Sequence, residues 1–260
     1  MKLGLFGGGF KPFTTGHFSK LARAIKDNDR VYLFYGLQER KPPKIGKRGK
    51  PLKSAQKFRP IGSSGRFYTP ELSREIFDIY ERAIERELPS VEVESTIGST
   101  PMQRVLETIE EFSENQDMYE KVTIYGAEDT IRDYITRARY FGDMLETGKA
   151  QLGAISPESI DDYMDEERLM DIVGRSEESS IEALSPYYPD ASREDLERMQ
   201  RIRGTEVRSI ASNEDGIEEA KRFLPPFLND EEKSKVISLL LGDQLSESLI
   251  KEYIIGIIRG

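Results

Sequence analysis

The sequence has no cysteine and a single histidine, His17. The absence of cysteine excludes disulfides, thiolate metal sites and cysteine nucleophiles, and one histidine argues against a zinc enzyme. Long apolar runs are also missing: no stretch approaches the roughly 18 residues of a membrane-spanning helix, and the N-terminus lacks the apolar core of a signal peptide. We therefore expect a cytoplasmic protein that does not engage a membrane.

Charge is plentiful but unevenly distributed. The 260 residues, enough for a large domain or a domain with an appendage, are 33% charged and carry a net charge of −9, which argues against general nucleic-acid binding. Residues 40–59 hold nine lysines and arginines and no acid, so the rest of the chain carries −18. Such a segment would attract small anions to one place. A solvated loop or a nucleic-acid-binding arm would have the same composition.

A short apolar run, a group of glycines and an amphipathic helix follow one another over residues 3–25. The run predicts a buried strand, and the glycines at 7–9 permit a tight turn or the close approach of a ligand. Apolar residues recur at helical spacing from Phe18 to Ile25, so a helix should begin near Gly16. A strand that turns at glycines into a helix presents unpaired N–H groups and a positive dipole end, which together favour phosphate.

His17 lies in the first turn of this predicted helix, at the edge of the expected phosphate site. A neutral or protonated imidazole can donate a hydrogen bond to a charged oxygen. The alternative is a surface histidine without a role, and the agreement of residue type, turn and position favours the phosphate contact.

Residues 8–17 resemble the (H/T)-x-G-H signature, with the glycine, phenylalanine and proline that precede it, of the nucleotidylyltransferase superfamily, which includes nicotinamide-nucleotide and phosphopantetheine adenylyltransferases and cytidylyltransferases. Thr14 stands where many members carry a first histidine and where phosphopantetheine adenylyltransferases have threonine, whereas Lys11 replaces a common aspartate. No dinucleotide-binding G-x-G-x-x-G followed by an acid is present. The residues that match the signature are Gly8, Phe10, Pro12, Thr14, Gly16 and His17.

Residues 201–210 resemble the late I-S-(G/S/T)-T-x-x-(R/K) motif of the same superfamily, which opens a helix. Gly204, Thr205 and Arg208 match the motif, and Arg203 replaces the usual serine. Gly204 admits close approach, Thr205 can cap the helix or bond a phosphate oxygen, and Arg208 can reach the same anion with its planar fork of donors. The alternative is that Arg208 simply pairs with a neighbouring acid.

Strand and helix patterns alternate along the chain and predict a Rossmann-like, doubly wound parallel α/β sheet of about five strands. Thr69-Pro70 and Thr100-Pro101 are typical helix starts. The expected strands lie at 3–8, 29–36, 90–96, 121–129 and 150–156, and further helices are expected at 130–140, 218–224, 230–241 and 246–258.

We divide the chain into three parts: a nucleotidyltransferase core of residues 1–156 with a basic loop inserted at 39–68, an acidic helical insertion at 157–200, and residues 201–260, whose motif and C-terminal helices complete the core. The insertion carries 14 acids against 4 arginines. It would form a lid or simply a solvated helical surface. The last predicted helix is apolar enough to pack on the core or on a second subunit, so the sequence is compatible with a homo-oligomer.

The resemblance implies transfer of a nucleotidyl group: an acceptor phosphate attacks the α-phosphorus of a nucleoside triphosphate, and pyrophosphate leaves. It makes His17, Thr14 and Arg208 the expected catalytic residues. No protein metal ligand is predicted, because Mg²⁺ would arrive with the triphosphate. The expected nucleotide-binding residues are Gly8, Gly9, Phe10, Gly16, Gly126, Asp129, Gly204 and Thr205, and the expected phosphate or acceptor contacts are Lys11, Arg40, Lys41 and Lys44. Asp129 would serve equally as the cap of the helix at 130–140.

The substrates that the resemblance implies are a nucleoside triphosphate and a phosphorylated small molecule, such as nicotinamide mononucleotide or a phosphorylated pantetheine or sugar. The threonine at Thr14 and the G-T-x-x-R pattern favour AMP transfer from ATP, with cytidylyl transfer to a phosphorylated alcohol or sugar as the runner-up. A non-catalytic nucleotide-binding or nucleic-acid-associated protein is the remaining alternative, because Lys11 and Arg203 depart from the superfamily pattern.

Overall fold

The computed structural model describes residues 1–37, 69–96, 100–114, 121–126, 150–152, 178–213 and 216–241. Its strands are β1 (Lys2–Gly8), β2 (Arg30–Gly36), β3 (Val91–Thr96), β4 (Lys121–Tyr125) and β5 (Ala150–Leu152). Between the strands lie α1 (Thr15–Asp27), α2 (Pro70–Glu87) and α3 (Pro101–Glu114). The C-terminal part holds η3 (Ser185–Tyr187), α7 (Arg193–Arg201), α8 (Gly204–Ala211), α9 (Gly216–Arg222) and α10 (Asp230–Leu241).

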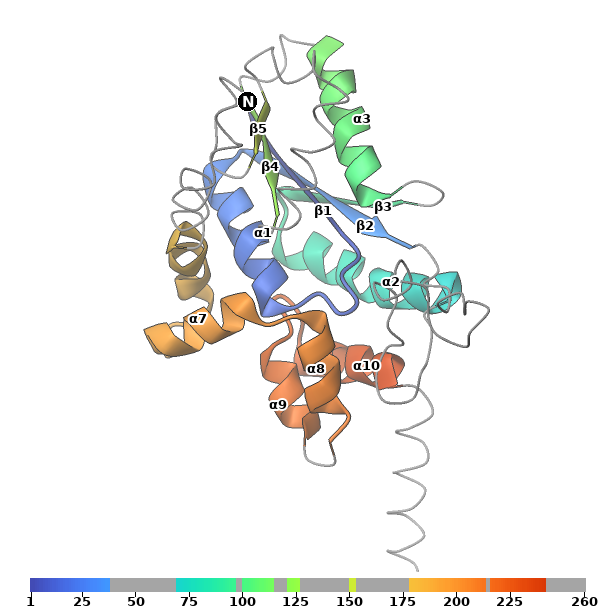
Figure 1. Ribbon diagram of the computed structural model, residues 1–260, viewed down its shortest axis with the longest axis vertical. Helices are drawn as coiled ribbons and strands as arrows, with labels where there is room; N and C mark the ends of the chain where they lie inside the picture. Colours follow the sequence, from blue (N-terminus) through green and yellow to red (C-terminus); the bar gives the residue numbers. More distant parts are fainter. Residues whose placement is uncertain are drawn as a thin grey trace, which may run out of the picture.

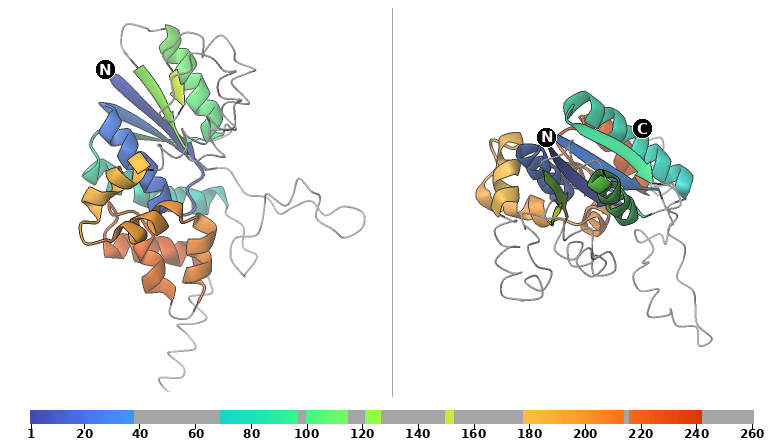
Figure 2. Two further views of the ribbon diagram at one scale, coloured as in Figure 1. Left: turned by 60° about the vertical axis from the view of Figure 1, so that its left-hand side comes forward. Right: turned by 90° about the horizontal axis from the view of Figure 1, so that it is seen from above.

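The five strands are parallel, in the order β3-β2-β1-β4-β5. From β1 the chain moves in one direction through α1 and α2 to β3, and α3 then carries it back to β4 on the other side of β1. Because such crossovers are right-handed, α1 and α2 cover one face of the sheet and α3 the other (Figures 1 and 2). The predicted doubly wound parallel sheet is therefore confirmed, with its topological switch point between β1 and β4.

Burial explains which strands lie in the centre. Leu3 and Leu5 of β1 and Val31 and Leu33 of β2 are essentially inaccessible to water, as expected for parallel strands covered on both faces. The edge strand β3 alternates instead, with exposed glutamates among its buried and half-buried residues. Charges on an edge strand disfavour pairing with another sheet.

The predicted helix starts are confirmed. The Thr69 hydroxyl accepts a hydrogen bond from the Leu72 N–H at 3.2 Å, and Pro70 occupies the first helical position of α2. At the start of α3, the Thr100 hydroxyl accepts from the Gln103 N–H at 3.1 Å. Each cap satisfies an N–H that the helix itself leaves without a partner.

The C-terminal helices α7 to α10 lie beyond the carboxyl ends of the strands, beside the start of α1 (Figure 1). The described half of the acidic insertion is helical at 178–184 and in α7, and its Leu184 and Leu196 are buried in the core. Lys20 of α1 donates to the Ser180 hydroxyl at 3.3 Å. Residues 178–200 therefore have one packed face, and the domain boundaries at 156 and 200 stay predictions.

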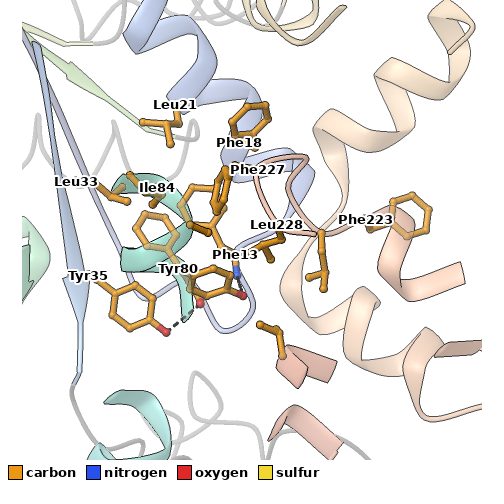
Figure 3. Packing of buried hydrophobic residues seen from close by; sticks show 14 of the residues in the cluster. Phe13, Phe18, Leu21, Leu33, Tyr35, Tyr80, Ile84, Phe223, Phe227 and Leu228 are labelled. Carbon is orange, nitrogen blue, oxygen red and sulfur yellow. Dashed lines mark hydrogen bonds between the residues drawn. The ribbon is translucent and has the colours of Figure 1, made fainter. Parts of the chain in front are cut away.

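Phe227 connects the C-terminal helices to the core. Its ring centroid lies 5.8 Å from that of Phe13, 5.7 Å from that of Phe18 and 6.5 Å from that of Tyr80 (Figure 3). Arg86 of α2 donates to both carboxylate oxygens of Glu232, at 2.8 and 3.0 Å, and to the Phe227 carbonyl at 3.1 Å. These contacts attach the segment before α10 to α1 and α2.

Several predictions lie outside the described residues: the conformation of the basic segment and of residues 157–177, and the helices at 130–140 and 246–258. Within the ranges that the structure describes, no helix is both long enough and apolar enough to cross a membrane.

We expect Phe227→Ala to lower the free energy of unfolding by about 3–5 kcal/mol, because it removes a buried aromatic ring and leaves a cavity. Denaturant titration measures the change. Tyr187→Ala is the matched control: Tyr187 also packs on Phe18 but is 39% exposed, so it should cost about 1 kcal/mol. Equal losses in the two variants would contradict the anchoring role of Phe227.

Candidate active site

The carboxyl ends of β1 and β4 meet at the switch point of the sheet. Phe6 is in register with Tyr125 of β4, so Gly126, the next residue, follows directly beside the glycines that end β1. Ligands of open α/β sheets bind in the crevice at this edge. The predicted residues Gly8 and Gly126 therefore lie where the topology places a ligand.

The loop from Gly9 to Phe13 connects β1 to α1. Phe10 has a φ of 27°, a left-handed conformation that is rare for a residue with a side chain, and it is 3% exposed. Its ring lies so close to Gly8 that a Cβ atom there would be 2.4 Å from Phe10 Cε1. Gly8 is thus required by the packing of Phe10, which covers it from one side.

Lys11, predicted as a phosphate contact, is buried at the same edge. Its ammonium group donates to the Gly36 carbonyl at the end of β2 at 2.7 Å and lies 5.8 Å from the centroid of the Tyr35 ring. The positive charge that this sequence has in place of the usual aspartate is therefore held between the ends of β1 and β2.

Thr14 caps α1 together with His17. The His17 N–H donates to the Thr14 hydroxyl oxygen at 3.3 Å, and the Thr14 N–H donates to His17 Nδ1 at 3.0 Å. The hydroxyl oxygen lies 2.9 Å from the same Nδ1 atom. The imidazole is thus held as the reciprocal partner in a capping box, a role that Glu or Gln usually takes.

These contacts determine the chemistry of the His17 ring. Desolvation among the Phe10 and Phe13 rings lowers the pKa of His17 to about 4, so the imidazole is neutral at pH 7. Because Nδ1 accepts the Thr14 N–H, the proton of the neutral ring is on Nε2. Among the described residues no side chain or main-chain group bonds Nε2, and His17 is partly exposed. The ring can therefore donate one hydrogen bond to a ligand.

The structure brings the two sequence motifs together. The Thr14 hydroxyl donates to the Ile202 carbonyl at 3.2 Å, and the Thr15 hydroxyl donates to the Met199 carbonyl at 2.8 Å. A Cβ atom on Gly16 would lie 2.6 Å from the carbonyl oxygen of Gln200. The motif glycine is therefore needed because residues 199–202 cross the first turn of α1.

Arg208 completes this junction from α8. It is 6% exposed, and its guanidinium group donates to the Lys11 carbonyl in the loop after β1. Gly204 lies close by, since its Cβ atom would be 3.2 Å from the same carbonyl oxygen. At least one donor of Arg208 is thus used to hold the loop rather than to bind a ligand.

The second motif opens a helix as predicted, but Thr205 does not cap it. The N-cap of α8 is Arg203, whose N–H donates to the Glu206 carboxylate at 2.7 Å. Thr205 is exposed in the first turn of α8. Arg203 stands where the motif that this segment resembles has a serine, and Glu206 supplies the cap from within the helix.

The expectation of unpaired N–H groups at the start of α1 is wrong at two positions. The Thr15 N–H donates to the Phe223 carbonyl at 2.8 Å, and the His17 N–H donates to Thr14. The first partner comes from a segment 208 residues away in the sequence, which local pattern analysis does not reach. A phosphate at this site would depend on side-chain donors more than the sequence suggested.

Other predicted contacts lie outside the described residues: Arg40, Lys41, Lys44 and Asp129. In the part of the chain that the structure describes, no group of three or more histidine, aspartate or glutamate side chains is placed to hold a metal ion. An open groove of about 480 Å³ runs between α7 and α8, apart from His17, and is lined by Arg198, Arg201, Ile202, Glu206, Ser209 and Ile210.

The sequence analysis missed two tyrosines beside the loop. The Tyr35 hydroxyl donates to the Phe10 carbonyl at 3.2 Å, and the Phe13 N–H donates to the Tyr80 hydroxyl at 3.0 Å. Both residues are 1% exposed. The hydrophobic pattern marks each as a core residue, and nothing in the sequence distinguishes a core tyrosine whose hydroxyl bonds the main chain.

Comparisons with known proteins add a distant likeness. No protein-family model matches the chain, and a search of curated proteins finds no match. Among solved structures the chain is similar to a bifunctional NMN adenylyltransferase/ADP ribose pyrophosphatase from Francisella tularensis, with 14% identity, a TM-score of 0.31, and coverage of 74% of this chain and 57% of that one.

A structure described as the same bifunctional protein complexed with AMP and a manganese ion gives 14% identity and a TM-score of 0.30, and the match covers 73% of this chain and 56% of that one. The chain thus spans little more than half the length of these proteins. At this level of similarity neither match identifies a substrate or a site residue here, and the assignment of the fold rests on the parallel sheet and its strand order.

Gly16→Ala should destabilise the protein, although alanine normally favours a helix over glycine by about 1 kcal/mol. The added methyl group would meet main-chain oxygens at 2.6 and 2.7 Å, and we expect a net loss of about 1–3 kcal/mol in unfolding free energy. In the control Gly204→Ala the nearest atoms are 3.2 Å away, so the loss should be smaller. A fully stable Gly16→Ala variant would show that residues 199–202 do not cross α1 here.

The depressed pKa of His17 predicts a pH-dependent stability. The pKa of the ring is near 6.5 in the unfolded chain and about 4 in the folded protein. At pH values between these two, the unfolded chain binds a proton at this ring and the folded protein does not. This stability is fully present above pH 6.5 and is lost as pH falls toward 4, by up to about 3 kcal/mol. Chemical denaturation across this range should show a shallower pH dependence for His17→Asn, and parallel curves would contradict the prediction.

Proposed function

We propose that the protein is a nucleotidyltransferase that transfers a nucleoside monophosphate, with AMP favoured, from a nucleoside triphosphate to a phosphorylated small molecule and releases pyrophosphate. The observation that carries the proposal is the junction of the two motifs: Thr14, which caps α1 together with His17, lies against the segment before α8, and Arg208 bonds the loop after β1. This junction lies at the carboxyl end of β1, next to the switch point of the sheet.

In this proposal His17 acts as a neutral hydrogen-bond donor. Thr14 holds Nδ1, so the Nε2–H points to the ligand side and donates to an oxygen of the reacting phosphate. Phosphoryl chemistry needs in-line positioning and donors aimed at developing charge more than it needs covalent help from the protein. A ring with a pKa of about 4 supplies such a donor without changing its protonation state across neutral pH.

Arg208, Lys11 and Mg²⁺ would contribute positive charge at different places in the proposed site. Arg208 holds the Lys11 carbonyl, and in this proposal its guanidinium charge also attracts the β- and γ-phosphates. Lys11 places its charge between the ends of β1 and β2, where an anionic acceptor would lie. Mg²⁺ would enter as part of the triphosphate substrate and would offset part of its negative charge.

Release of pyrophosphate from ATP or CTP, measured with a panel of phosphorylated acceptors, tests this function. We expect activity with ATP to exceed that with CTP, and turnover to require an acceptor phosphate. Acceptor-dependent release of pyrophosphate from CTP but not from ATP would favour the cytidylyltransferase alternative. Tight nucleotide binding without any release of pyrophosphate would favour the non-catalytic one.

His17→Asn is the decisive variant, because an asparagine oxygen can still accept the Thr14 N–H but the Nε2 donor is lost. We expect turnover to fall by about 10²- to 10³-fold, the usual cost of removing one donor from a transition-state site. Arg193→Ala, which removes an exposed cation that pairs with Glu178 and Glu197, is the control and should retain its rate. Near-normal turnover in His17→Asn would refute the role of the imidazole.

A further inference from the structure

We propose that Tyr80 of α2, with Tyr35 of β2 as its counterpart, is a positioning residue: it holds the loop between β1 and α1 and thereby sets the orientation of the His17 ring. The predicted effect on turnover rests on the proposed function. The predicted effect on His17 itself does not, and it can be measured without any substrate.

The loop needs to be held because its conformation is not intrinsically favoured. Phe10 adopts a positive φ of 27°, which a residue with a side chain keeps only where its surroundings impose it. Phe10, Lys11 and Phe13 are all buried, so their main-chain polar groups need partners inside the protein.

Three side chains from three elements supply these partners. The Tyr35 hydroxyl donates to the Phe10 carbonyl at 3.2 Å, Arg208 donates to the Lys11 carbonyl, and the Tyr80 hydroxyl accepts the Phe13 N–H at 3.0 Å. The two tyrosines come from β2 and α2, and the arginine comes from α8. The loop is therefore held from several sides by groups far apart in the sequence.

The bond to Tyr80 is the one next to the imidazole. Phe13 directly precedes Thr14, whose N–H and hydroxyl lie 3.0 and 2.9 Å from His17 Nδ1. The Phe13 ring also packs on the His17 ring, with 5.6 Å between centroids. A shift of the Phe13 main chain would thus move both the cap and the aromatic wall that orient His17.

The alternative is that Tyr80 acts only through its ring, which packs against Phe13, Tyr35 and Phe227 (Figure 3). Tyr80→Phe separates the two roles, because it keeps the ring and removes the hydroxyl alone. Tyr188→Phe is the matched control: the Tyr188 hydroxyl is buried but has no hydrogen-bond partner among the described residues.

Because His17 is the only histidine of the 260-residue chain, its imidazole gives one set of nitrogen and carbon-bound proton signals in an NMR spectrum. We expect Tyr80→Phe to shift the Nδ1 and Nε2 signals and to move the pKa of His17 upward toward 6.5. Tyr188→Phe should leave both unchanged. With ATP and an active acceptor, Tyr80→Phe should lower kcat by about 10- to 100-fold and change KM by less than about threefold.

An unchanged His17 spectrum in a folded Tyr80→Phe variant would overturn the proposal. A shifted spectrum with normal turnover would support the positioning of His17 and count against the proposed function. If Tyr80→Phe does not fold, Tyr35→Phe provides the same test through the Phe10 carbonyl: a shifted His17 signal supports the proposal, and an unchanged signal overturns it.

Discussion

The rest of the structure depends on one constraint: the main chain between β1 and α1 turns inside the protein, where its polar groups cannot reach water. A buried carbonyl or N–H without a partner costs about 1–3 kcal/mol. The loop avoids this cost through Tyr35, Tyr80 and Arg208, which satisfy Phe10, Phe13 and Lys11. The neighbouring elements must therefore lie where these side chains can reach, and His17 takes its orientation from the result.

The same constraint explains why the C-terminal helices belong to the site. The start of α1 is closed by the Phe223 carbonyl and by residues 199–202, while Phe227 packs among the aromatic residues of α1 and α2. Removing residues 199–241 would leave polar groups of α1 and of the loop after β1 without their hydrogen-bond partners. The sheet provides the edge at which the proposed ligand would bind, and the C-terminal helices pack beside that edge, against the start of α1.

Much of the architecture was predictable from local patterns. Buried strands, the Thr69-Pro70 helix start and the amphipathic face of α1 each depend on residues within a few positions of one another. The superfamily resemblance also paired the two motifs across nearly 200 residues, and the bonds from Thr14 to Ile202 and from Arg208 to Lys11 join these two parts of the chain, while the roles of the motif residues stay predictions. The unpaired N–H groups at Thr15 and His17 were predicted wrongly, since their partners depend on the folded chain.

The sequence by itself determined the parallel α/β class, the turn at the glycines after β1, and the single imidazole at the start of α1. Only the tertiary structure decided the state of that imidazole: desolvation beside Phe10 and Phe13 lowers its pKa, and the Thr14 N–H places the proton of the neutral ring on Nε2. Only the tertiary structure assigned hydroxyls of core tyrosines to the loop. Periodicity reports which face of an element is buried, whereas protonation and hydrogen bonding depend on the atoms that long-range packing brings together.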